Sequence, residues 1–126
     1  DLSFDDDARI REAAATGCSG ITQALNGAGA DRQERIVAGN VAIDELVRGI
    51  EELDRSVLAD DEPALDWVAD WERLATEREA FGERLAGNSA ARFKIPETDD
   101  GYPITQRLID VAPPECERAV TLASQP

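Results

Sequence analysis

The sequence contains no histidine, and this absence excludes several kinds of site. Among 126 residues there are only two cysteines, Cys18 and Cys116. Because structural zinc sites need four Cys or His ligands, we predict no metal site of this kind. Nucleophilic systems that pair serine or cysteine with histidine are missing for the same reason. The glycines at 27 and 29 are not followed by the lysine of a phosphate-binding loop.

Long apolar runs and methionine are absent too. No stretch of 18 apolar residues occurs, whereas a membrane-spanning helix needs about 20. We therefore predict no transmembrane segment in this chain. Since the chain begins at Asp1 without methionine, we expect that an export signal or membrane anchor has been removed from its N-terminal side.

Basic residues are scarce relative to acidic ones. The chain has 13 Lys and Arg against 27 Asp and Glu, which gives a formal net charge of −14. Because such a chain repels phosphate groups, we predict that it binds neither nucleic acid nor anionic membranes. Basic proteins, cations and cationic peptides remain candidate partners. The charge can also serve solubility alone.

Aromatic residues make up only 5% of the chain, so the core must consist mostly of Ala, Leu, Ile and Val, as is typical of helical proteins. We predict one all-α domain over 1–126, an antiparallel bundle of three long helices with an irregular strap and one or two short C-terminal helices. The long helices are predicted over 5–26, 31–59 and 63–86, the strap over 88–102, and the short helices over 103–110 and 114–123.

The second predicted helix, 31–59, has the clearest pattern. Asp31 with Glu34 forms a capping box. Val41 and Val47 widen its apolar face beyond the heptad positions. Those positions are Ile36, Gly39, Ile43, Leu46, Ile50, Leu53 and Val57.

The third predicted helix carries one seam with spacings of 4, 3, 4, 3 and 4 residues, formed by Trp67, Trp71, Leu74, Arg78, Phe81 and Leu85. A short connection makes it a hairpin with the second helix. This pairing places Arg78 near Asn40 and Asp44, and Trp67 near Asp54. The opposite face, with Asp66, Asp70, Arg73 and Glu77, is predicted to be a solvated stripe.

The two cysteines can form a disulfide or remain two separate buried thiols. A disulfide would close a loop of about 100 residues, worth about 4–5 kcal/mol in the chain-entropy model. Gly17 and Gly20 flank Cys18 and either allow another helix to approach closely or kink their own helix. We predict the disulfide Cys18–Cys116, which implies an oxidising, extracytoplasmic location.

Arg78 occupies a seam position where an apolar residue is expected, and an unpaired buried charge is expensive. One interpretation is a structural arginine bonded to Asp44, Asn40 or carbonyl groups of 91–105. The other is an arginine that recognises an anion in a pocket between helices, with Trp67, Trp71 and Tyr102 as further ligand-binding residues.

The region from 91 to 115, which contains the strap, is either packed across the bundle or serves as a binding loop. Its apolar side chains Phe93, Ile95, Tyr102 and Ile104 favour packing. The acidic residues at 97, 99 and 100 do not match the spacing of a helix-loop-helix calcium site, so we interpret them as a solvated turn.

One segment, from Trp71 to Cys116, also carries a resemblance. Its residues are Trp71, Leu74, Arg78, Phe81, Leu85, Phe93, Pro96, Asp100 to Thr105, Arg107, Pro113, Pro114 and Cys116. In these residues the chain resembles uncharacterised small exported or membrane-anchored helical proteins of high-GC Gram-positive bacteria. The resemblance covers about a third of the chain. It implies export and a helical fold, and it brings no activity or cofactor.

From these features we predict a non-enzymatic, extracytoplasmic helical module that binds a protein or a small ligand, with a homodimer as a further partner arrangement. We predict no catalytic residue and no cofactor. The alternative is a small-molecule-sensing bundle with a pocket near Arg78. A third hypothesis is a hydrolase that uses acidic residues.

Overall fold

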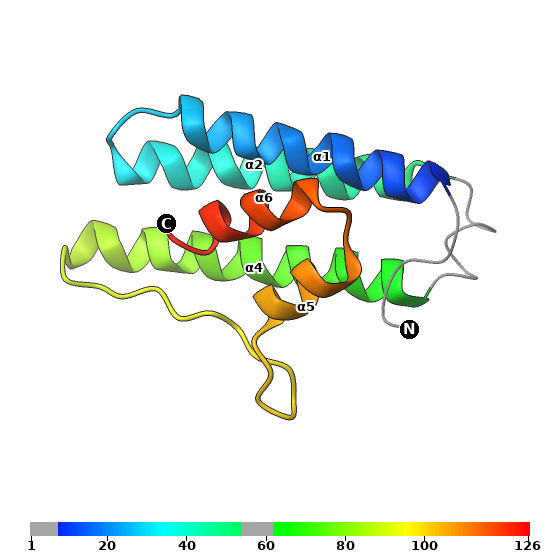
Figure 1. Cartoon of the computed structure of the whole chain (residues 1–126). Coiled ribbons are helices and arrows are strands. Elements are labelled where there is room, and N and C mark those ends of the chain that lie inside the picture. The colour runs from blue at the N-terminus through cyan, green and yellow to red at the C-terminus, as the bar shows by residue number, and fades with distance from the viewer. Residues whose placement is uncertain (1–7, 54–61) are drawn as a thin grey trace.

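The computed structural model describes residues 8–53 and 62–126, and within them it confirms the all-α prediction (Figure 1). The only β-type pairing in this part of the chain is an isolated bridge between Glu97 and Pro103. None of the described helices has the length and apolar character that crossing a membrane requires. The helices are α1 (Ala8–Gly27), α2 (Arg32–Glu51), α4 (Glu62–Gly87), α5 (Ile104–Val111) and α6 (Glu115–Ala123).

The helix predicted over 31–59 ends earlier than expected. Its described part, α2, ends at Glu51, and the N–H of Leu53 bonds to the carbonyl of Ile50 at 3.1 Å in a tightened turn. Leu53 still packs against the core from this turn. A periodic apolar side chain can therefore lie beyond the end of its helix. Residues 5–7 of the first predicted helix and 54–59 of the second lie outside the described residues.

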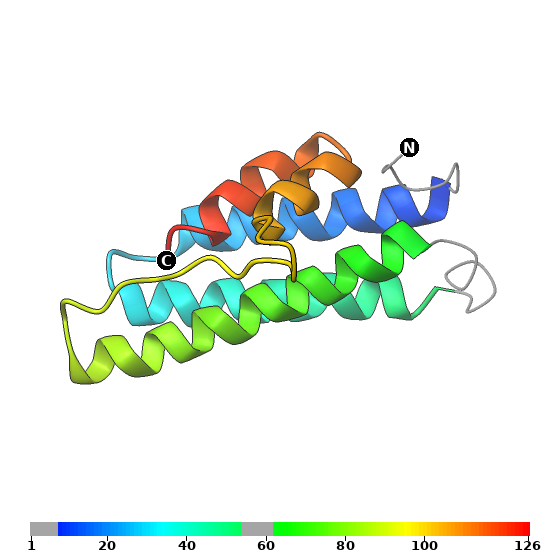
Figure 2. The ribbon, with the colours of Figure 1, turned by 90° about the horizontal axis from the view of Figure 1, so that it is seen from below.

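The described helices pack side by side around a shared core. Helix α2 packs against α1 on one side and α4 on the other, and α1 and α4 both run opposite to α2 (Figures 1 and 2). On the remaining side, α6 packs against α1, α5 packs against α4, and the two short helices contact each other. The C-terminal third thus closes the bundle between α1 and α4.

The predicted seam of α4 lies in the core. Trp67 and Trp71 are fully buried, with their ring centroids 5.9 Å apart in an edge-to-face arrangement. The indole N–H of Trp67 donates to the carbonyl of Leu108 in α5 at 2.8 Å. Asp54, the acceptor predicted for it, lies outside the described residues. Leu74, Arg78 and Phe81 are buried, and Leu85 is half-buried.

The first part of the strap between α4 and α5 lies along α4, and the loop that follows it projects away from the bundle before α5 begins (Figures 1 and 2). The ring of Phe93 in the strap packs edge to face on the ring of Phe81, with the two ring centroids 5.7 Å apart. Main-chain carbonyls of the strap accept hydrogen bonds from α4, including one from Arg73 to Glu97 at 2.9 Å. Tyr102, predicted as an apolar anchor, is 41% exposed.

The disulfide prediction is confirmed. Cys18 of α1 and Cys116 of α6 are bonded, fully buried, and have their Cα atoms 5.0 Å apart. Helix α1 is continuous through this region. A methyl group placed on Gly17 would lie 2.6–2.8 Å from three side-chain carbons of Leu46. Because Gly17 has no side chain, α1 and α2 can approach each other closely at this point.

We expect Gly17→Ala to destabilise the fold and Gly20→Ala, three residues along the same helix, to stabilise it. The first methyl group overlaps Leu46, at a cost of about 1–3 kcal/mol. The second meets no atom within 4 Å, so alanine gains up to about 1 kcal/mol through helix propensity. Urea unfolding measures both. Equal effects of the two substitutions would contradict the proposed contact.

We expect the double variant Cys18→Ala, Cys116→Ala to lose about 2–5 kcal/mol of unfolding free energy, because the open chain gains entropy when unfolded. Urea unfolding followed by circular dichroism measures the loss. Wild-type protein in reducing agent is the control and should approach the variant. An unchanged unfolding midpoint in both would show that the disulfide does not stabilise the bundle.

Candidate functional site

Arg78 is fully buried and hydrogen-bonded to four oxygen atoms of the protein. Its Nε donates to Oδ1 of Asn40 at 2.8 Å, and its Nη1 donates to the carbonyl of Ala123 at 2.7 Å. Its Nη2 donates to the carbonyls of Arg35 and Ile36, each at 3.3 Å. The guanidinium thus connects α4 with α2 and with the last residue of α6.

These partners correct part of the sequence interpretation. Asn40 was predicted as an acceptor and is one. Asp44 is not, because it forms an exposed ion pair with Arg48 at 2.7 Å. The remaining acceptors come from α2 and α6 instead of residues 91–105. The seam indicated that Arg78 points inward, but it could not show which segment would cover it.

The charge of Arg78 is balanced by main-chain carbonyls, since no described carboxylate forms an ion pair with it. Burial, with the positive charge of Arg35, lowers the pKa of Arg78 to about 10. The group therefore stays protonated at neutral pH. The carbonyl of Ala123 lies at the C-terminal end of α6, where the helix dipole favours a cation. A methyl group on Gly39 would overlap the guanidinium, so the glycine makes room for it.

The other predicted ligand-binding residues do not join Arg78 in one cavity. Trp67 and Trp71 are buried in the core, and the indole N–H of Trp71 has no hydrogen-bond partner in the described structure. Tyr102 lies on the surface, where its hydroxyl donates to Oδ2 of Asp110 at 3.0 Å. That hydrogen bond raises the pKa of Tyr102. None of these four residues lines the grooves described below.

Asp70 was predicted on a solvated stripe, and this prediction is wrong. Its side chain is buried and accepts two hydrogen bonds from Arg107 of α5, both at 2.7 Å. This bidentate pair raises the pKa of Arg107. The periodicity of α4 could not reveal it, because the partner is 37 residues away and covers Asp70 only once α5 packs on α4.

The acidic residues of the strap lie in a surface turn. The N–H of Gly101, which has φ of 82°, bonds to the carbonyl of Thr98 at 2.9 Å. The hydroxyl of Thr98 donates to Asp100, and this bond lowers the pKa of the Asp100 carboxyl. In the described ranges, no group of three or more Cys, Asp or Glu side chains is arranged to hold a metal ion.

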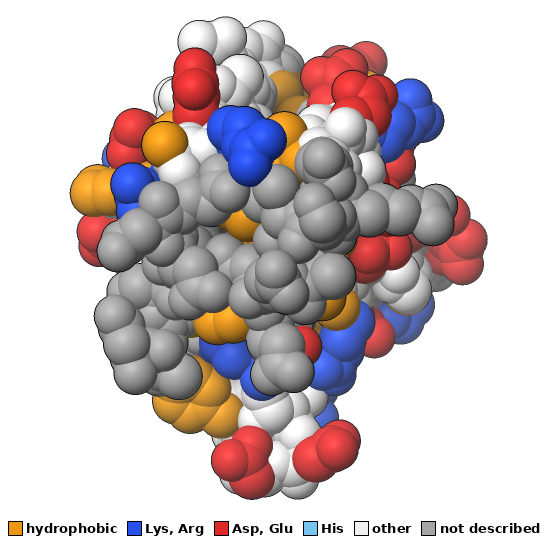
Figure 3. Space-filling view, turned by 90° about the vertical axis from the view of Figure 1, so that its right-hand side faces the viewer, with side chains coloured by type: hydrophobic (Ala, Val, Ile, Leu, Met, Phe, Trp, Pro, Cys, Tyr) orange, Lys and Arg blue, Asp and Glu red, His pale blue; other side chains and the backbone are white. Residues whose placement is uncertain are grey.

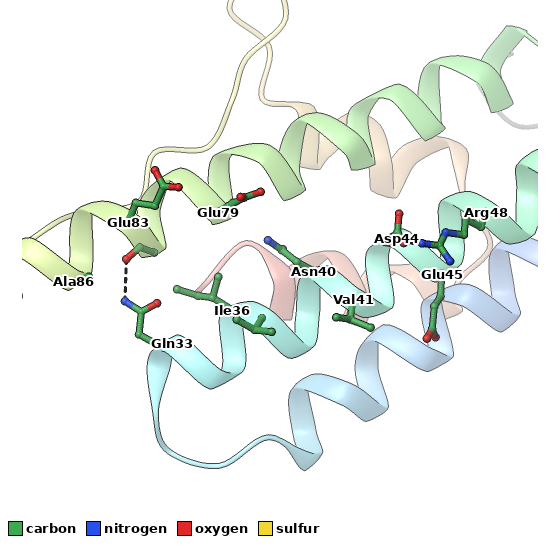
Figure 4. A pocket seen from close by; sticks show the side chains of 12 residues that line it. Gln33, Ile36, Asn40, Val41, Asp44, Glu45, Arg48, Glu79, Glu83 and Ala86 are labelled. Atoms are coloured by element: carbon green, nitrogen blue, oxygen red, sulfur yellow. Dashed lines mark hydrogen bonds and ion pairs between the residues drawn. The ribbon is translucent and has the colours of Figure 1, made fainter.

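An open groove lies between α2 and α4, and α6 lies behind the two helices in Figure 4. Its volume is about 750 Å³. Val37 and Val41 line it with 62% and 55% of their surfaces exposed, although Val41 was predicted to widen the buried face. The described lining residues are Gln33, Ile36, Val37, Asn40, Val41, Asp44, Glu45, Arg48, Glu79, Gly82, Glu83 and Ala86.

The rims of this groove are acidic. Asp44 and Glu45 lie on the α2 rim, and Glu79 and Glu83 lie on the α4 rim (Figure 4). Among the described lining residues, Arg48 is the only basic one, and it is paired with Asp44. At the end of the bundle where α1 begins, by contrast, acidic and basic side chains are interspersed on the visible surface (Figure 3).

One end of the groove is held by a hydrogen bond between the two helices. The side-chain amide of Gln33 donates to the carbonyl of Gly82 at 2.8 Å (Figure 4). On the other side of α2, a second groove of about 700 Å³ runs along α1 and is floored by small residues such as Gly17, Gly20 and Ala42. Glu45 lines both grooves. The outward surface of α2 is therefore a ridge with a groove on each side.

Comparisons with protein-family models, with curated proteins and with solved structures gave no match. The resemblance of the segment from Trp71 to Cys116 therefore stays a prediction.

We expect Arg78→Ala to lower the free energy of unfolding by about 3 kcal/mol or more, because four buried or part-buried acceptors each lose a donor. Arg48→Ala is the matched control, since it removes an exposed pair and should cost less than about 1 kcal/mol. Urea unfolding of both variants measures the difference. Similar small losses would contradict a structural role for Arg78.

Proposed function

We propose that this chain is a non-enzymatic, extracytoplasmic module that binds another protein through the groove between α2 and α4. The observation that carries the proposal is the exposure of Val37 and Val41 in that groove. Contiguous exposed apolar surface with a polar border is typical of interaction sites. Ile36, Gly82 and Ala86 are further lining residues without a polar side chain.

The chemistry of the lining supports binding more than catalysis. Its carboxylates, Asp44, Glu45, Glu79 and Glu83, belong to exposed residues. Enzymes that use a carboxyl group as an acid or base commonly place it in a buried environment that changes its pKa. An exposed rim of charge around an apolar floor is instead the composition of a protein interface.

Hydrogen bonds between α2 and α4 favour a groove that is already formed before a partner binds. The hydrogen bonds of Arg78 fix the spacing of α2 and α4 from inside, and the bond from Gln33 to Gly82 fixes it at one end. A rigid surface loses little conformational entropy when a partner binds. The buried disulfide supports the extracytoplasmic part of the proposal, because such bonds persist in oxidising compartments.

The sensing hypothesis places the ligand at Arg78. An anion there would have to displace Asn40 or the carbonyl of Ala123 from a fully buried guanidinium. No observation on the described residues favours that exchange, so we place binding at the groove.

The test is a selection of random peptides of about 16 residues, displayed on phage, against the wild-type protein. Selected peptides are then measured against the double variant Val37→Glu, Val41→Glu. Both positions are exposed, so the variant should keep its unfolding midpoint. We expect its affinity to fall at least about tenfold. Leu65→Glu is the control, since Leu65 is 45% exposed and lies outside the groove.

If selection yields no peptide whose binding depends on Val37 and Val41, the groove is not the docking surface. The same conclusion would follow if Leu65→Glu weakened binding as much as the double variant.

A further inference from the structure

Resting on the groove as the docking surface, we propose that its occupant is a basic amphipathic helix of a partner protein. The inference joins three features of the described residues: the sign of the rim charges, the shape of the groove between two helices, and the exposed valines on its α2 side. Each restricts the chemistry of the occupant.

The rim charges select a basic partner. Of the four acidic residues in the lining, only Asp44 forms an ion pair within the described structure. Glu45, Glu79 and Glu83 are exposed and face solvent without a basic partner there. Lysine or arginine side chains that flank an apolar stripe would meet these carboxylates on both sides of the groove. Such complementarity speeds association and selects against partners of the wrong charge.

The shape of the groove selects a helix. Both walls are α-helices, whose main-chain groups are bonded internally, so the groove offers no open strand edge to an extended peptide. From Gln33 to Arg48 the α2 wall rises about 22 Å, which is about four helical turns. A partner helix of about 16 residues would span it. Its apolar residues would follow the i, i+3, i+4, i+7 pattern to contact Val37 and Val41.

A second copy of this chain is a poor occupant. In a twofold-symmetric dimer the same surface meets itself, so the acidic rims would approach each other. Each chain also carries a formal net charge of −14. Repulsion between like charges would oppose the contact that the valines favour. The charge argument therefore separates a basic partner from a homodimer.

The experiment uses three designed peptides of about 16 residues. One is an amphipathic helix with leucine on one face and lysine on its flanks, the second replaces every lysine by glutamate, and the third is a scrambled form of the first. Fluorescence anisotropy measures their binding to the wild-type protein. We expect the basic helix to bind at least about tenfold more tightly than either control, and salt to weaken it.

Charge reversal supplies the sharper measurement. Glu79→Lys, Glu83→Lys should lower affinity for the basic helix about tenfold or more and raise affinity for the acidic one. Glu72→Lys, Glu117→Lys changes the net charge equally at exposed positions outside the groove, and should have a smaller effect. Unfolding midpoints of both variants verify that they fold.

The outcomes separate the two proposals. If acidic or scrambled peptides bind as tightly as the basic helix, the partner chemistry is wrong, while a selected peptide that depends on Val37 and Val41 would preserve the docking surface. If the basic helix binds the Glu79→Lys, Glu83→Lys variant unchanged, it binds elsewhere and the inference fails. If wild-type protein sediments as a dimer that Val37→Glu, Val41→Glu dissociates, the occupant is a second copy and the inference fails.

Discussion

The arrangement of the other elements depends on the hydrogen bonds that the buried guanidinium of Arg78 donates. The guanidinium lies on α4, is covered from α2 by Asn40 and two carbonyls, and is covered from α6 by the carbonyl of Ala123. A buried cation without acceptors would cost several kcal/mol. If α6 moved away from α4, Arg78 would lose the carbonyl of Ala123 as an acceptor, and part of this cost would be incurred. The short C-terminal helix is held in place by polar bonds as well as by apolar contact.

Two further constraints act on the same C-terminal third. The disulfide fixes α6 to α1, and the pair between Asp70 and Arg107 fixes α5 to α4. The short helices α5 and α6 have few residues with which to bury apolar area, so specific bonds contribute much of their attachment. Val37 and Val41 of α2 remain exposed, because none of the described helices covers them. Specific bonds thus hold the side of the bundle that α5 and α6 cover, whereas apolar side chains are exposed where Val37 and Val41 lie.

The sequence predicted the parts of this fold that depend on local periodicity. The helical class, the inward direction of Arg78 and both tryptophans, and the bond between Cys18 and Cys116 could all be inferred from residue spacing and residue counts. What could not be inferred depends on where distant segments pack. Asp70 is buried because α5 covers it, and Val41 is exposed because no described helix covers that side of α2. The groove depends on the second of these facts, the exposure of α2, so periodicity alone did not locate it.

The position of the disulfide also has a mechanical consequence. Cys18 and Cys116 are 98 residues apart in sequence, yet their Cα atoms are 5.0 Å apart. Tension applied to the two ends of the chain passes from one cysteine to the other through the sulfur atoms and bypasses the residues between them. Only the segments before Cys18 and after Cys116 can be drawn out while the bond is intact. The groove between α2 and α4 lies wholly within the bypassed part, so its two walls are shielded from a pull on the ends of the chain.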